Sequence, residues 1–289
     1  MRSKLGQIVN GKYVYNSPLE LPSYWKEKGV ALYPNRTTPP TRHAHFYSSD
    51  SEEMFNQNLE IMPEDWEYRH KVLNYTFNSE NFRCPEFGEI DWENSTLYFG
   101  CSTAFGIGVD DEGTLPYHLG KVLGEPVINL GIPGASNQEI FNLSLDILDK
   151  YPTPKRVIFS WTGTDRYVLY GDGNTHSQIG PWDLNEEFNV EFDIGHNPHA
   201  DFANALVPNI THGLLSGMYI AKAAEHLWAG RAELITVSYF DHVAHHFGAD
   251  MCFEMNNGAR DRLHSSSEDN LHNAVVIANI IKRKQVKAL

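Results

Sequence analysis

Short apolar segments alternate with helical patterns from residue 95 onward, and this alternation constrains the fold more than any other feature of the sequence. Four apolar runs indicate strands, at residues 95–100, 126–131, 156–161 and 232–240. Apolar spacing and capping residues indicate helices between and after them, at residues 115–124, 136–151, 213–230 and 269–284. Because parallel strands need crossover connections, such alternation is typical of a parallel sheet covered by helices on both faces. The sequence therefore predicts an α/β fold.

Two parts of the chain depart from the alternation. Residues 1–92, here called the arm, are interrupted by prolines and lack sustained periodicity. They nevertheless carry many large aromatic side chains, namely Trp25, Phe46, Tyr47, Phe55, Trp66, Tyr68, Tyr75, Phe77 and Phe82. So many apolar groups do not stay solvated, so we expect the arm to pack on the main domain, residues 93–289, and to help wall a substrate pocket. Residues 167–212, here called the insert, are rich in Gly, Asn, Asp and His, and we expect them to form loops beside the strand ends.

The composition argues against several classes of function. Lys and Arg number 23 against 37 Asp and Glu, a formal net charge of -14, so the basic surface that a nucleic-acid binder needs is not expected. No stretch approaches the ~18 apolar residues of a membrane helix, and the first residues lack the apolar core of a signal peptide. Cys84, Cys101 and Cys252 are widely spaced, which suggests free thiols in a reducing compartment. We expect a cytoplasmic protein that binds neither nucleic acid nor membranes.

A serine directly after the first predicted strand is the first candidate catalytic residue. The segment FGCSTAFGIG places Ser102 at the carboxyl edge of the sheet, where open α/β sheets bind ligands. Its alternative role is to cap a helix or to tighten a turn. The second candidate is Gly134, in a tight turn after the second predicted strand. Its backbone N–H would serve an oxyanion hole there, or belong to an ordinary turn before a helix.

The loop before the last predicted helix holds Asp261 and His264, three residues apart. One tight turn would bring the carboxylate beside His264 Nδ1, fix the tautomer and leave Nε2 to take a proton from a serine. Alone, this spacing fits a salt-bridged surface loop equally well. Three further histidines lie close together in the sequence, but no carboxylate completes a recognised zinc motif around them, at His242, His245 and His246. We therefore expect no metal ion.

The ordered set of these elements resembles the SGNH, or GDSL-like, hydrolase superfamily over about residues 95–285. In that family a Gly-Asp-Ser follows the first strand, a Gly the second and a Gly-x-Asn-Asp the third, and an Asp-x-x-His precedes the last helix. The counterparts here are Gly100-Cys101-Ser102, Gly134, Gly163-Thr164-Asp165 and Asp261-Arg262-Leu263-His264. The resemblance implies a three-layer α/β/α, flavodoxin-like fold without a cofactor. It also implies that Ser102 is the nucleophile, His264 the base and Asp261 the acid that orients it.

Two residues depart from the family's pattern. Cys101 stands where the family has Asp, which costs a structural hydrogen bond but no catalytic group. Thr164 stands where the family has the Asn of the oxyanion hole. A threonine hydroxyl still donates one hydrogen bond, from a shorter side chain, so the predicted hole consists of Ser102, Gly134 and Thr164. Two other amide side chains are alternative donors, those of Asn137 and Asn174.

Four residues near the predicted strand ends are expected to contact a substrate, namely Trp161, Asp165, Arg166 and Asn137. Trp161 would line the floor of the pocket, and Arg166 would either bind an anionic group bidentately or pair with Asp165. We therefore expect a serine-dependent ester hydrolase or acyltransferase that acts on a small-molecule or glycan ester. The alternative is a catalytically weak or inactive protein that keeps the scaffold for a binding or structural role, because a fold does not imply an activity.

Overall fold

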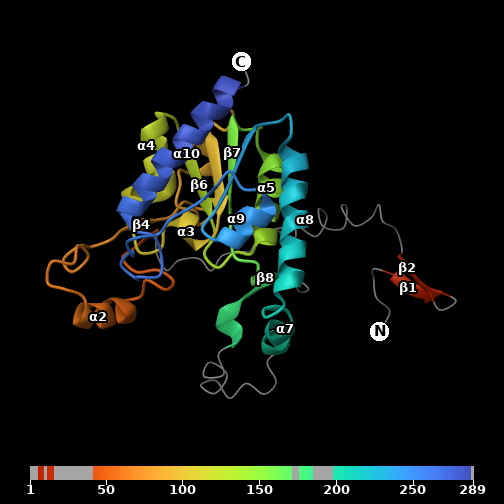
Figure 1. Ribbon diagram of the computed structural model, residues 1–289, viewed down its shortest axis with the longest axis horizontal. Helices are drawn as coiled ribbons and strands as arrows, with labels where there is room; N and C mark the ends of the chain where they lie inside the picture. Colours follow the sequence, from red (N-terminus) through yellow and green to blue (C-terminus); the bar gives the residue numbers. More distant parts are fainter. Residues whose placement is uncertain (1–5, 10–11, 16–41, 171–175, 185–197, 288–289) are drawn as a thin grey trace.

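A five-stranded parallel sheet lies at the centre of the computed structural model (Figure 1), which describes residues 6–9, 12–15, 42–170, 176–184 and 198–287. The strands are β5 (Thr96–Gly100), β6 (Val127–Gly131), β7 (Arg156–Trp161), β10 (Glu233–Ser238) and β11 (Met251–Cys252). They lie in the order β11-β10-β7-β5-β6. Numbered along the chain, this order is 2-1-3-4-5, the flavodoxin-like arrangement. The predicted fold class is confirmed.

Helices cover both faces of the sheet, with β-strands between them (Figure 1). One face packs on α5 (Asn137–Lys150), α8 (Ile210–Trp228) and α9 (Asp241–Phe247), and the other on α4 (Leu115–Leu123) and α10 (Ser267–Lys287). Successive strand residues point to opposite faces, so Phe99 and Phe159 join the first core cluster, while Tyr98 and Ile158 join the second. Burial on both faces explains why the strands are apolar runs instead of alternating patterns.

The insert is more regular than the sequence suggests. Strand β8 (Tyr167–Tyr170) pairs with β9 (His176–Ile179) as an antiparallel hairpin, followed by a 3-10 turn, η4 (Pro181–Leu184), and helix α7 (Pro198–Leu206). A small cluster of buried side chains, Ile179, Ala203 and Val207, packs these elements together. The prediction of loops was wrong. The apolar residues that pack these elements together are few and separated by polar residues, so they form no pattern in the sequence.

The described part of the arm consists of short elements. They are β1 (Gly6–Val9), β2 (Lys12–Tyr15), β3 (His43–Ala44), α2 (Glu52–Ile61), β4 (Tyr75–Thr76) and the 3-10 turn η1 (Phe87–Glu89). The aromatic side chains of Tyr68, Tyr75 and Phe77 are buried together with Phe105 and Ile107 of the main domain. Trp25 lies outside the described residues. In the described part of the arm, these aromatic side chains therefore pack against the segment that follows Ser102.

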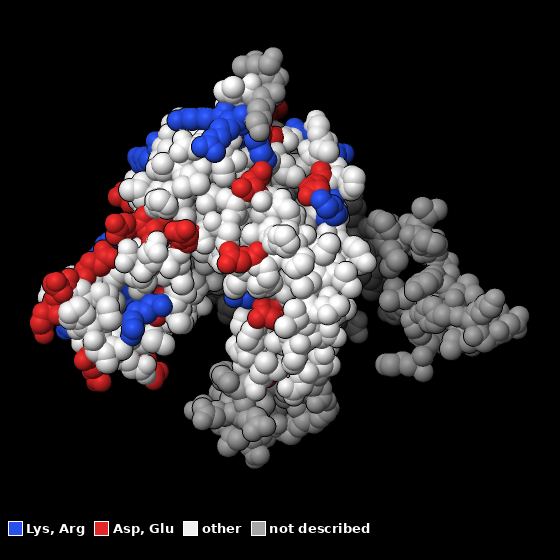
Figure 2. Space-filling model, in the orientation of Figure 1, with Lys and Arg blue, Asp and Glu red and all other residues white. Residues whose placement is uncertain are grey.

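Charges gather unevenly over the surface that Figure 2 shows. Asp and Glu gather over the region of α2, whose first turn carries Glu52 and Glu53. Lys and Arg gather near the C-terminal end of α10, where Lys282, Arg283 and Lys284 follow one another. These cations lie at the negative end of the helix dipole, as the sequence predicts. Within the described residues, no helix is both long and apolar enough to cross a membrane.

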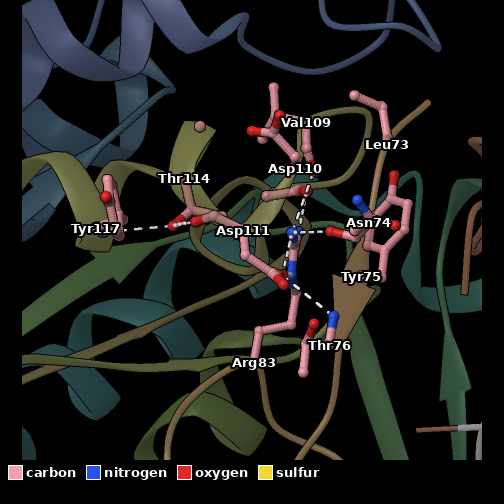
Figure 3. A network of polar contacts seen from close by, with 12 residues as sticks. Leu73, Asn74, Tyr75, Thr76, Arg83, Val109, Asp110, Asp111, Thr114 and Tyr117 are labelled. Carbon is pink, nitrogen blue, oxygen red and sulfur yellow. Dashed lines mark hydrogen bonds and ion pairs between the residues drawn. The ribbon is translucent and has the colours of Figure 1, made fainter. Parts of the chain in front are cut away.

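A buried arginine ties the arm to the loop after α3 (Ser102–Phe105), as Figure 3 shows. Arg83 leaves only 1% of its side chain exposed. Its guanidinium donates hydrogen bonds to the carbonyls of Phe105 (3.1 Å), Gly106 (2.5 Å) and Val109 (3.1 Å). It also forms an ion pair with Asp111, whose Oδ1 lies 2.7 Å from Nη2. Arg83 thereby fixes the backbone just downstream of Ser102.

Candidate active site

Ser102 is the first residue of α3 and follows β5 directly, so its side chain lies at the carboxyl edge of the sheet. Helix α3 can occupy this place only because its backbone approaches the end of β6 very closely. A Cβ atom at Gly131 would lie 2.3 Å from the backbone nitrogen of Phe105, far inside van der Waals contact. Glycine at position 131 is therefore a requirement for placing Ser102 between β5 and β6.

Asp261, His264 and Ser102 form a continuous chain of hydrogen bonds. His264 Nε2 lies 2.8 Å from Ser102 Oγ, and His264 Nδ1 lies 2.7 Å from Asp261 Oδ2. Asp261 Oδ1 accepts from the backbone N–H groups of Leu263 (3.1 Å) and His264 (3.2 Å), which closes the turn between the two side chains. Arg262 has a φ of 60°, in the left-handed region, and this allows the tight turn. The structure thus brings together the three residues that the sequence singles out.

The carboxylate of Asp261 is buried, with 1% of the residue exposed. Burial alone would raise the pKa of this carboxyl. The hydrogen bond and charge of His264 outweigh burial, with help from Ser49 and the Leu263 amide, and lower the pKa of Asp261 below its usual range. Asp261 is therefore ionised at neutral pH and able to hold His264 in the tautomer that leaves Nε2 facing Ser102.

Ser49, from the arm, is a site residue that sequence reasoning missed. Its hydroxyl donates to Asp261 Oδ2 at 2.8 Å, the same oxygen that receives His264 Nδ1. The next arm residue, Asp50, forms a buried two-point ion pair with Arg260, with both N–O distances at 2.8 Å. Asn58 of α2 also donates to the Arg260 carbonyl at 3.0 Å. No local pattern signals these contacts, because Ser49 and Asp261 are 212 positions apart.

The three predicted oxyanion-hole residues follow neighbouring strands. Ser102 follows β5, Gly134 lies in the turn after β6, and Thr164 lies after β7. Gly134 has a φ of +75°, which a residue with a side chain rarely adopts, so the turn depends on glycine. Gln178 of β9 lies against it, since a Cβ at Gly134 would be 2.8 Å from Gln178 Oε1. Because the strand order reverses at β5, this edge is the crevice where such sheets bind ligands.

Cys101, the residue before Ser102, is buried at the end of β5. Burial would raise the pKa of its thiol, but the Arg166 guanidinium and the hydrogen bond with Thr103 lower it to about 7. The thiol Sγ lies 3.5 Å from Thr103 Oγ1. A buried thiol whose pKa is lowered therefore occupies the position where the resembled family carries an aspartate.

Two of the predicted substrate-contacting residues, Trp161 and Asn137, have structural contacts inside the protein. Trp161 is 1% exposed and packs in the core, stacked on Phe159 with ring centroids 4.7 Å apart, so it does not line a pocket floor. Strand β7 is buried on both faces, so the indole of Trp161 is buried as well. Asn137 uses its amide to bind the backbone of Thr162, with Nδ2 to O at 3.1 Å and N to Oδ1 at 2.8 Å. Asn137 therefore joins the start of α5 to the end of β7.

Arg166 lines a cavity at the end of β7, and Asp165 precedes Arg166 in the chain. No ion pair joins them among the described residues, so the pairing that the sequence left open is not formed. Arg166 instead lies over the ring of Trp182, 5.6 Å from its centroid. Asn174, the other alternative oxyanion donor, lies outside the described residues. Across the described ranges, no group of three or more His, Cys, Asp or Glu side chains is arranged to hold a metal ion.

Fold and site together define an α/β protein with a Ser-His-Asp array at the carboxyl edge of a flavodoxin-like sheet. No protein-family model and no curated protein matches the sequence.

Three solved structures are similar at low identity. A protein assigned to the G-D-S-L lipolytic family from Desulfitobacterium hafniense DCB-2 is 16% identical, with a TM-score of 0.31, over 54% of this chain. This match spans 66% of that protein's length, just under two thirds. AlinE4, an SGNH-hydrolase family esterase, is 13% identical over 56% of this chain and 76% of its own, with a TM-score of 0.31. The psychrotrophic esterase EstA from Pseudoalteromonas sp. is 12% identical over 67% and 99%, with a TM-score of 0.38.

Proposed function

We propose that the protein is a serine-dependent ester hydrolase or acyltransferase, in which Ser102 is the nucleophile, His264 the general base and Asp261 the orienting acid. The observation that carries this proposal is the unbroken array of hydrogen bonds, 2.7 Å from Asp261 to His264 and 2.8 Å from His264 to Ser102. A serine is a weak nucleophile at neutral pH and needs an adjacent base that is itself held in place. This array supplies both requirements.

The reaction proceeds in two steps, acylation of Ser102 and release of the acyl group. His264 Nε2 takes the proton of Ser102 as Oγ attacks the ester carbonyl, and a tetrahedral oxyanion forms. The oxyanion collapses, the bond to the alcohol oxygen breaks, and His264 returns the proton to the leaving alcohol. Water or an acceptor hydroxyl then gives its proton to His264, attacks the acyl-Ser102 ester and releases the acyl group. His264 returns that proton to Ser102 Oγ, which restores the free enzyme.

The oxyanion would be stabilised by the backbone N–H groups of Ser102 and Gly134 and by the Thr164 hydroxyl. Donors aimed at the place where charge develops supply much of the rate enhancement in such sites, and loss of one typically costs about 10²–10³ in rate. Thr164 reaches less far than the asparagine of the resembled family. This difference is the observation that favours the second candidate, a catalytically weak or inactive protein that uses the same scaffold for binding.

Covalent labelling of Ser102 by a fluorophosphonate separates the two candidates. The hydrolase predicts labelling of the wild-type protein and its loss in Ser102→Ala and His264→Ala. Thr103→Ala, which removes the neighbouring hydroxyl, should still be labelled. Hydrolysis of 4-nitrophenyl butyrate, measured on the same four proteins, should follow the labelling. If the wild-type protein is folded but is neither labelled nor active, the hydrolase is excluded and the second candidate, the binding protein, is retained.

A further inference from the structure

A cavity of about 210 Å³ lies between the β8–β9 hairpin, α7 and α8, at the end of β7. Its walls are mainly apolar or small, among them Val168, Phe202, Leu206 and Ile220. Its polar side is formed by Thr164, Arg166, Asn137 and His212. Among the described residues that line it, none carries a carboxylate. A positive charge in an otherwise neutral cavity indicates a site for an anionic group.

Thr164 connects this cavity with the sheet edge that carries the candidate nucleophile. Thr164 follows β7, the strand that pairs directly with β5, and β5 ends at Gly100, two residues before Ser102. Asn137, another lining residue, holds the backbone of Thr162 through two hydrogen bonds. Although burial opposes it, the Arg166 guanidinium together with Thr162 helps to lower the pKa of Cys101, which is bonded to Ser102. A substrate at Ser102 can therefore extend into the cavity.

Arg166 is prepared to receive an anion. Within the described part of the chain, no carboxylate forms an ion pair with its guanidinium, and its Nε is buried without a hydrogen-bond partner. Its guanidinium carbon lies over the Trp182 ring, 5.6 Å from the ring centroid, in a cation–π contact. The N–H donors of a guanidinium lie in one plane, and this fork matches the two oxygens of a carboxylate or phosphate.

We propose that Arg166 binds an anionic group of the substrate, so that the preferred esters carry a negative charge a few bonds from the scissile carbonyl. The inference rests on the proposed function for the identity of the ester, but the anion site itself stands on the cavity and on Arg166. The apolar walls fit the short carbon chain that links such a charge to the ester. A protein with a formal net charge of -14 repels anions in general, so the preference must come from a local cation.

Two pairs of esters, in each of which one member carries an additional carboxylate, test the proposal. The first pair, 4-nitrophenyl butyrate and 4-nitrophenyl hemisuccinate, has the charge on the acyl side. The second pair, phenyl acetate and 4-acetoxybenzoate, has it on the alcohol side. We expect kcat/KM of the wild-type protein to be about 10–100-fold higher for the charged member of one pair, the range expected for one charge-assisted hydrogen-bonded contact. The pair that responds identifies the side of the ester that enters the cavity.

Arg166→Met should remove this preference, because kcat/KM should fall about 10-fold or more further for the charged esters than for their neutral partners. Arg166→Lys, which keeps the charge without the planar fork, should restore part of it. Lys222→Met is the matched control, because Lys222 is an exposed cation of α8 that pairs with Glu225. Turnover of neutral esters without any charge preference, or equal losses for neutral and charged esters in Arg166→Met, would overturn the inference.

Calorimetry with the Ser102→Ala protein separates this inference from the proposed function. Monomethyl succinate should bind to it, and Arg166→Met in the same background should weaken this binding about 10-fold or more. If the wild-type protein hydrolyses none of the esters, but the Ser102→Ala protein binds monomethyl succinate in a way that depends on Arg166, the anion site is retained and the hydrolase is dismissed. Binding that is absent, or unchanged by Arg166→Met, would dismiss the anion site whatever the protein hydrolyses.

Discussion

At the scale of single residues, Asp261 holds the site together electrostatically. It is buried, ionised and bonded to His264 through Oδ2. Replacement by asparagine would favour the wrong histidine tautomer, so we expect Asp261→Asn to lower turnover by about 10⁴-fold if the array behaves like that of a serine protease. Ester hydrolysis by the purified variant measures this loss. An unchanged rate would mean that another group orients His264.

The lowered pKa of Asp261 also predicts how stability depends on pH. A carboxyl group whose pKa is lower in the folded state binds fewer protons there than in the unfolded chain, where its pKa is about 3.9. Its contribution to the free energy of unfolding is therefore complete above about pH 5 and is lost as the pH falls through the folded-state pKa. Urea unfolding of the wild type and Asp261→Asn from neutral to acidic pH should show the difference between them shrinking only in that acidic window.

Ser49 is expected to act as a positioning residue through the same carboxylate. Its hydroxyl shares Asp261 Oδ2 with His264. Its removal takes away one contact that holds the carboxylate in place and leaves that oxygen a stronger acceptor for His264 Nδ1–H. We expect Ser49→Ala to lower kcat about 10-fold, the loss expected for one hydrogen bond to a charged group, and to shift the acidic limb of the pH–rate profile to higher pH. Ser79→Ala, which removes an exposed arm hydroxyl that binds Glu86, is the control. A lower rate with an unshifted limb would reduce Ser49 to a structural role.

At the scale of elements, Arg83 is the residue that holds the arm against the loop after α3 (Figure 3). Its removal leaves several buried carbonyls without donors and leaves Asp111 unpaired. We expect Arg83→Met to lower the free energy of unfolding by about 3 kcal/mol, in the range for breaking a buried polar network. Urea unfolding measures the change. Lys71→Met, which breaks the nearby but more exposed pair with Asp110, should cost at most about 1 kcal/mol.

At the scale of the whole molecule, the arm and the main domain share both a core and a site. Tyr68 packs with Phe105, and Ser49 and Asp50 contact the loop that carries Asp261. We therefore expect a chain without residues 1–70 to be less stable and to lose ester hydrolysis, because apolar surface is uncovered and the loop of the acid loses its support. Thermal unfolding and kcat/KM for the four esters check this. A folded product with unchanged substrate preference would show that the arm contributes nothing to the site.

The sequence by itself determined the central architecture and the main candidate residues. Periodicity and capping are local properties, so they predicted four of the five strands of the sheet, the major helices and the α/β class before any packing was known. The two-residue strand β11 was missed because it is too short to show a pattern. Asp261 and His264 were also predictable, because a single turn joins them.

Tertiary structure alone decided which distant groups meet. It placed Ser49 on Asp261 across 212 positions, turned Trp161 into the core and left Arg166 over Trp182 instead of paired with Asp165. It also gave the insert its hairpin. These contacts depend on how whole elements pack, and the order of residues within any one segment carries no local signal of them.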